Sequence, residues 1–183
     1  MKRTAKKMLL AVLMFCMLFS VPAMAKTPSK TTVKKAYQTY IRKNLSNRYK
    51  YNYPKVKYFD INKDGINEMI YMYEAGVRYA VQVYTYRNNR VVHMSPKRFV
   101  GCCSVAQIRG KKYLVILQSN GAVDNMSTAY VVSGTRLKKV VSYRMRAIYK
   151  NGIETGRILY TKNGKKCSER EYNAFNAKLK TIR

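Results

Sequence analysis

The strongest chemical signal in the sequence is a cluster of oxygen-bearing side chains within residues 58–70. They stand at positions 1, 3, 5 and 9 of one short segment: Asp60, Asn62, Asp64 and Glu68. Calcium binds six to eight hard oxygen ligands, and alternate residues of a tight loop can all point inward only where the chain reverses sharply. Gly65, at position 6, allows that reversal, and the backbone carbonyl of Ile66 would supply a further ligand. We therefore expect these residues to form a calcium-binding loop.

The concentration of acids in this segment supports a bound cation. Residues 26–183 contain eight Asp and Glu, and three of the eight lie within residues 60–68. Nearby Lys55, Lys57 and Lys63 would lower the affinity, so occupancy would suit the higher calcium concentrations outside a cell. The ion would then stabilise a hairpin rather than take part in catalysis. In the alternative interpretation, Asp60 and Asp64 only cap a turn and bind no ion.

An EF-hand would need a bidentate Glu at position 12 and a helix on each side of the loop. Tyr71 stands at position 12, and both flanks have the composition of β-strands. Residues 58–70 instead resemble the strand–loop–strand calcium hairpin of FG-GAP and integrin-α-like repeats, with the pattern Asp-x-Asp/Asn-x-Asp-Gly-x-x-Asp before an apolar strand. The resemblance implies that the same four side chains bind the ion, although Glu68 replaces the usual Asp. It covers a single copy, so the complete fold of those repeats is not implied.

The first 25 residues have the pattern of a cleavable signal peptide. Basic residues precede an apolar run over residues 8–21 and a small-x-small cleavage site that ends at Ala25. This run is shorter than the roughly 20 residues that a membrane-spanning helix needs. We expect cleavage after Ala25, a linker over residues 26–30 and a single domain over residues 31–183. The processed protein would be secreted or associated with the cell envelope.

The processed chain is strongly basic. Of the 37 Lys and Arg, 33 lie beyond the signal segment, so the net charge after cleavage is 33 − 8 = +25. A charge of this size repels itself and favours a polyanionic partner such as wall teichoic acid, an acidic glycan or an anionic lipid surface. Nucleic acid would match the charge without specificity, and in a simpler interpretation the lysines are only solvated. We predict a non-enzymatic binding module for an anionic envelope or host polymer.

The fold expected around the loop is α+β and mainly β. Apolar spacing predicts an amphipathic helix from Thr31 or Thr32 to about Asn47, docked on a sheet. Alternation and turn residues predict antiparallel strands within 55–61, 68–74, 79–87, 90–94, 98–105, 113–118, 128–133, 137–146 and 156–161. A capping box from Ser168 to Glu171 begins a second helix that reaches Leu179. The meander could form a sandwich, a curled sheet or a partial barrel. Residues 160–172 also resemble the closing hairpin and helix of small exported proteins of Gram-positive anaerobes, which implies no activity.

The cysteines and the single histidine give little support to catalysis. Cys102, Cys103 and Cys167 are an odd number, so either all three are thiols or Cys167 pairs with one of the other two. His93 lies in a strand-like segment, where we expect a packed side chain, and the familiar hydrolase and phosphate-loop motifs are absent from the sequence. The alternative to a binding module is a secreted enzyme or inhibitor with an unrecognisable site, for example a Cys-His hydrolase using Cys102 or Cys103 with His93.

Overall fold

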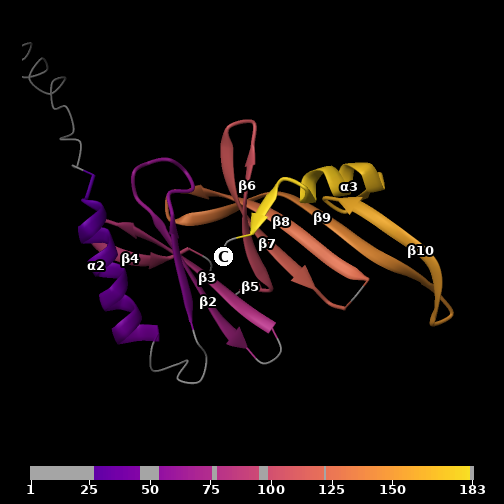
Figure 1. Cartoon of the computed structure of the whole chain (residues 1–183), viewed down its shortest axis with the longest axis horizontal. Coiled ribbons are helices and arrows are strands. Elements are labelled where there is room, and N and C mark those ends of the chain that lie inside the picture. The colour runs from indigo at the N-terminus through magenta and orange to yellow at the C-terminus, as the bar shows by residue number, and fades with distance from the viewer. Residues whose placement is uncertain (1–26, 46–53, 76–77, 95–98, 122, 182–183) are drawn as a thin grey trace, which may run out of the picture.

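The computed structural model describes residues 27–45, 54–75, 78–94, 99–121 and 123–181. These residues form two antiparallel sheets, each with a helix packed against its outer face (Figure 1). The prediction of a mainly β, α+β fold with a helix near each end is therefore confirmed, and neither sheet of the described chain closes into a barrel. The predicted signal peptide, residues 1–25, lies outside the described residues. No helix within them is long and apolar enough to cross a membrane.

The two sheets follow the chain order closely. In the first, the order is β1-β2-β3-β4, with β5 also paired to β3; the order in the second is β11-β10-β9-β8-β7-β6-β12. The first sheet contains β1 (Lys55–Phe59), β2 (Glu68–Ala75), β3 (Arg78–Arg87), β4 (Arg90–His93) and β5 (Phe99–Val100). The second contains β6 (Cys102–Ile108), β7 (Lys111–Ser119), β8 (Asp124–Ser133), β9 (Arg136–Lys150), β10 (Ile153–Lys162), β11 (Lys165–Lys166) and β12 (Leu179–Thr181). The predicted meander is thus present, divided between two sheets.

The N-terminal helix, α2 (Lys30–Tyr40), begins at a side-chain cap. The hydroxyl of Ser29 accepts a hydrogen bond from the backbone N–H of Thr32 at 3.1 Å, which satisfies one free donor of the first turn. The predicted linker therefore ends one residue inside the helix. After Tyr40 the chain continues as a π-helical turn, η1 (Ile41–Leu45), so the α-helix is shorter than the sequence predicted.

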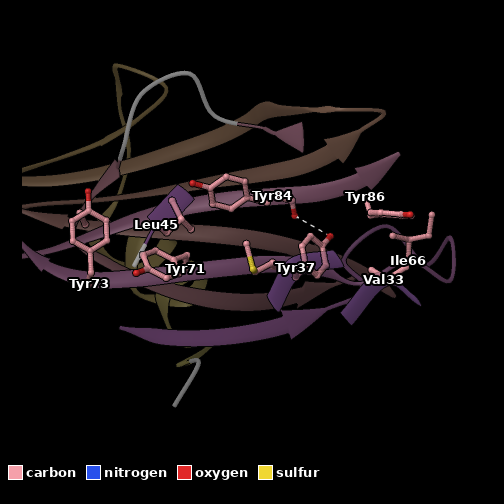
Figure 2. Packing of buried hydrophobic residues seen from close by; sticks show 10 residues of the cluster. Val33, Tyr37, Leu45, Ile66, Tyr71, Tyr73, Tyr84 and Tyr86 are labelled. Carbon is pink, nitrogen blue, oxygen red and sulfur yellow. Dashed lines mark hydrogen bonds between the residues drawn. The ribbon is translucent and has the colours of Figure 1, made fainter. Parts of the chain in front are cut away.

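Tyrosines dominate the layer between α2 and the first sheet (Figure 2). Along β2, Tyr71 and Tyr73 face α2 while Ile70 faces the second sheet, as the two-residue period of a strand requires. Tyr37 of α2 is fully buried, and its hydroxyl donates a hydrogen bond to the carbonyl oxygen of Asn67 at 2.8 Å. Because a buried hydroxyl needs a partner, this bond fixes α2 over the residue that precedes β2.

A second apolar layer lies between the sheets. Its buried side chains include Val81 and Val83 from β3 and Leu114 and Ile116 from β7. The chain passes from β5 to β6 through Gly101, whose backbone φ of +141° is strongly unfavourable for residues with a side chain. This crossing joins the two sheets and leaves their facing surfaces free to pack together.

The C-terminal helix, α3 (Glu169–Asn176), starts at the predicted capping box. The hydroxyl of Ser168 accepts the N–H of Glu171 at 3.2 Å, and Phe175 stacks on Tyr143 of β9 with ring centroids 4.6 Å apart. The predicted extension of this helix through Leu179 is wrong. Leu179 begins β12, which pairs with the edge strand β6, because that edge offers unpaired backbone groups that outweigh a weak helix preference.

Candidate functional site

The loop that joins β1 to β2 is held by hydrogen bonds to its own backbone. Both carboxylate oxygens of Asp60 accept backbone N–H groups, from Asp64 at 3.1 Å and from Gly65 at 3.0 Å. Lys63 and Gly65 adopt positive φ values of 62° and 84°, which turn the chain back toward β2. The sequence correctly predicted a sharp reversal at Gly65. It predicted Asp60 as a calcium ligand or, in the alternative interpretation, as a residue that caps this turn.

Asp64 receives the largest number of donors in this loop. Its carboxylate accepts the N–H of Ile66 at 2.9 Å and the side-chain amide of Asn62 at 2.8 Å, and it forms an ion pair with Arg87 at the end of β3. Partial burial opposes ionisation of Asp64, but the hydrogen bonds from Arg87, Ile66 and Asn62 outweigh it and lower its pKa. Arg87 therefore supplies a positive charge at the place where the sequence predicted a metal ion.

Glu68, the first residue of β2, is fully buried. Its carboxylate accepts the backbone N–H of Ile61 at 3.0 Å and lies 3.4 Å from the hydroxyl of Thr85. Burial raises the pKa of Glu68 to about 7; the hydrogen bond from Ile61 opposes this shift, whereas the charges of Asp64 and Asp60 add to it. Glu68 is therefore close enough to Asp60 and Asp64 for their charges to raise its pKa, but its own hydrogen bonds are to Ile61 and Thr85.

The structure brings four of the five predicted ligand residues into one hydrogen-bonded turn. Asp60, Asn62, Asp64 and the backbone of Ile66 share hydrogen bonds, whereas Glu68 bonds to Ile61. The donor set consists of hard oxygens and fits calcium in its chemistry. Within the described residues, however, no three acidic, thiol or imidazole groups converge on one point where a metal could bind.

A cationic cavity of about 530 Å³ adjoins this loop. Its basic side chains are Lys63 from the loop, Arg109 from the β6–β7 turn, and Lys111 and Lys112 at the start of β7. Ile61 and Val132 form part of its apolar wall. None of the residues that line it is acidic, so the lining carries a net positive charge.

Two hydrogen bonds connect the loop to the β6–β7 hairpin beside this cavity. The ammonium of Lys63 donates to the carbonyl oxygen of Gly110 at 3.1 Å, and that of Lys112 donates to the carbonyl oxygen of Asp60 at 3.3 Å. A lysine on each side is therefore held by a backbone carbonyl oxygen on the side of the other sheet. The sequence predicted a turn at residues 109–111 but not its position beside the acidic loop. The basic residues within 109–112 were the one feature of the sequence that could have indicated this position.

Cys103 and His93, two residues of the alternative Cys-His hydrolase, lie in different layers. Cys103 is buried between the sheets, and burial raises its thiol pKa to about 12, far from a reactive thiolate. His93 pairs with Tyr84 on the face of the first sheet that is turned toward α2, with ring centroids 4.7 Å apart. All three cysteines in the described chain, Cys102, Cys103 and Cys167, are free thiols. The geometry therefore gives no support to a Cys-His pair.

Comparison of the chain with protein-family models, with curated proteins and with solved structures finds no match.

Proposed function

We propose that this protein is an exported, non-enzymatic module that binds a linear anionic polymer in the cationic cavity beside the β1–β2 loop. The observation on which this depends is the convergence of Lys63, Arg109, Lys111 and Lys112 on one hollow without an acidic residue in its lining. Phosphate or carboxylate groups repeated along a chain would neutralise these charges. Wall teichoic acid and acidic glycans are polymers of this kind.

The shape of the site favours a polymer chain over a flat anionic surface for this cavity. A concave site surrounds a narrow chain and can exclude water from its charged groups, whereas a planar surface reaches only the rim. Lys63 and Lys112 are already oriented by hydrogen bonds to Gly110 and Asp60, so less side-chain entropy is lost when an anion binds. The apolar wall at Ile61 and Val132 would contact the uncharged part of a repeat unit.

Charge reversal in the cavity tests this proposal. Lys111→Glu is expected to weaken binding of heparin and of purified wall teichoic acid by about tenfold at low salt, because one attraction becomes a repulsion close to the anion. The matched control is Lys139→Glu, an exposed lysine on β9 outside the cavity, which changes the net charge by the same amount. Isothermal titration with both polymers measures the two affinities. Equal losses in the two variants would show that binding is diffuse, and the cavity proposal would be wrong.

We further propose that calcium binds the β1–β2 loop and stabilises it. The hard-oxygen donor set and the tight reversal at Gly65 support this, and Arg87 would have to leave Asp64 for an ion to enter. Calcium is therefore expected to raise the melting temperature of the processed chain, and Asp60→Ala should abolish the increase.

Arg87→Gln provides the sharper test of the calcium proposal. This variant should bind calcium more tightly than the parent, because it removes the competing charge beside Asp64 while keeping a polar side chain. Calorimetric titration of calcium into the parent, Asp60→Ala and Arg87→Gln proteins gives the comparison. A melting temperature that does not change with calcium in either the parent or the Arg87→Gln protein would reject the proposal.

A further inference from the structure

The hairpin formed by β9 and β10 extends beyond the rest of the second sheet. On one side, β8 pairs with β9 only as far as Arg146, and on the other, β11 pairs with β10 only at Thr161 and Lys162. Residues 148–158, which we call the ribbon tip, therefore form a two-stranded ribbon without a flanking strand in the described chain. Figure 1 shows this ribbon reaching past the end of α3, with its turn at the far right of the molecule.

The ribbon tip holds most of the large apolar side chains that the described chain exposes. Ile153 is 74% exposed, Tyr149 57% and Ile158 44%, and the remaining one, Val140, lies farther back on β9. Isolated exposed apolar residues are ordinary, but three within eleven residues concentrate exposed apolar surface at the end of a projecting ribbon. Such a concentration indicates a binding surface.

The apolar side chains point to both faces of the ribbon. Ile153 stands opposite Lys150, whereas Tyr149 stands opposite Glu154, and neighbouring positions on a strand alternate between faces. A flat protein partner would cover only one of these faces. A medium that surrounds the tip would bury both Ile153 and Tyr149, and the interfacial region of a lipid bilayer is a medium of this kind.

Charges on the ribbon tip favour an anionic partner. The ribbon tip contains two basic residues, Lys150 and Arg157, and one acid, Glu154. The exposed Arg146 lies at the base of the ribbon. Tyrosine and basic side chains are enriched where proteins meet lipid headgroups, and each cation near an anionic leaflet adds a favourable contribution.

The edge of β10 does not favour the addition of a strand from a second copy of this chain. The pairing of β10 with β9 is interrupted between Glu154 and Ile158, where Gly156 adopts a φ of +70°. The hydroxyl of Thr155 donates to the carbonyl oxygen of Ile148 at 2.7 Å. Bulges of this kind disturb the regular edge that a further strand needs, and two strongly basic chains repel each other.

We propose that the ribbon tip inserts into the interfacial region of a lipid bilayer rich in anionic lipid. Ile153 and Tyr149 enter the boundary between headgroups and acyl chains, and Lys150 and Arg157 contact the lipid phosphates. This surface is separate from the cationic cavity, so the protein would hold a polymer at one site and a membrane at the other.

A single introduced tryptophan tests the insertion directly. The chain contains no Trp, so Ile153→Trp places the only indole of the protein at the ribbon tip. Emission from the processed chain, residues 26–183, should shift to the blue with vesicles of equal parts phosphatidylcholine and phosphatidylglycerol, and brominated lipid should quench it. Val140→Trp, on the paired strand β9 but away from the tip, is the matched control and should show neither change.

Vesicle partitioning then separates insertion from general attraction of charge. Ile153→Ser combined with Tyr149→Ser should reduce co-sedimentation with these vesicles by about tenfold, whereas Val140→Ser should leave it unchanged. Co-sedimentation without a blue shift at position 153 would mean attraction of charge alone and would overturn the proposal. A blue shift that needs no vesicles and grows with protein concentration would indicate a second copy as the partner, which also overturns it.

Discussion

Replacing Gly101 with alanine is expected to lower the free energy of unfolding by about 3 kcal/mol. Gly101 has a φ of +141°, and a Cβ at this position would overlap the carbonyl oxygen of Leu117 on β7. The backbone cannot easily move away, because the N–H of Gly101 donates to the carbonyl oxygen of Tyr79 at 2.7 Å. Relief of the overlap would disturb β3 in one sheet or β7 in the other. Both strands contribute to the layer between the sheets.

Urea denaturation of Gly101→Ala and Gly134→Ala measures this effect against a matched control. Gly134 also has a positive φ, +59°, but a Cβ there would meet nothing within 4 Å. Its substitution should therefore cost only the conformational strain of a left-handed residue, about 1 kcal/mol. A similar loss in both variants would mean that the crossing between the sheets can relax. The two-sheet packing would then be less rigid than the geometry indicates.

The local elements of this fold could be predicted because local residues determine them. Asn88 and Asn89 both adopt positive φ, 50° and 58°, at the predicted β3–β4 turn, as asparagine tolerates better than most residues. The capping box at Ser168 likewise depends on a contact only three residues long. In both cases the residue types alone define the backbone conformation. No distant part of the chain is needed.

The candidate site could be predicted only in part, because half of it comes from distant segments. Asp60 and Asn62 meet Asp64 through a turn of a few residues, which the spacing of the motif shows. Arg87 reaches Asp64 from 23 residues away, and Lys112, at the start of β7, reaches Asp60 from 52 residues away. The first contact needs β3 to pair with β2 within one sheet, and the second needs the two sheets to pack together. Nothing in the local sequence indicates which strands will pair or face each other.

Glu68 is expected to make the calcium-free protein less stable as the pH rises from 5 to 8, by about 3 kcal/mol. Its pKa is about 7 in the folded protein and near its ordinary value of 4.5 in the unfolded chain. Between these values the folded state keeps a proton that the unfolded state has released, so folding binds a proton. This contribution is complete below pH 4.5 and is lost as the pH rises through 7.

The difference between the parent and Glu68→Gln isolates this effect. Glutamine keeps hydrogen-bonding groups beside Ile61 and Thr85 but does not titrate, so the variant should lack the decline. Burial lowers the pKa of His93, which opposes the trend below about pH 6.5, but that contribution is present in both proteins and cancels. The lowered pKa of Asp64 acts only at more acidic pH.

Urea denaturation in the presence of a chelator, repeated at several pH values for both proteins, gives this comparison and also bears on the loop. A cation bound near Asp60 and Asp64 would favour the ionised form of Glu68, so saturating calcium should reduce the parent's loss of stability at high pH. Parallel pH profiles for the parent and Glu68→Gln would contradict a protonated, buried Glu68. If calcium does not change the pH profile of the parent, Glu68 is still a buried, protonated acid. Its ionisation is then not linked to a bound ion. The two outcomes therefore distinguish the packing of Glu68 from its predicted role as a ligand.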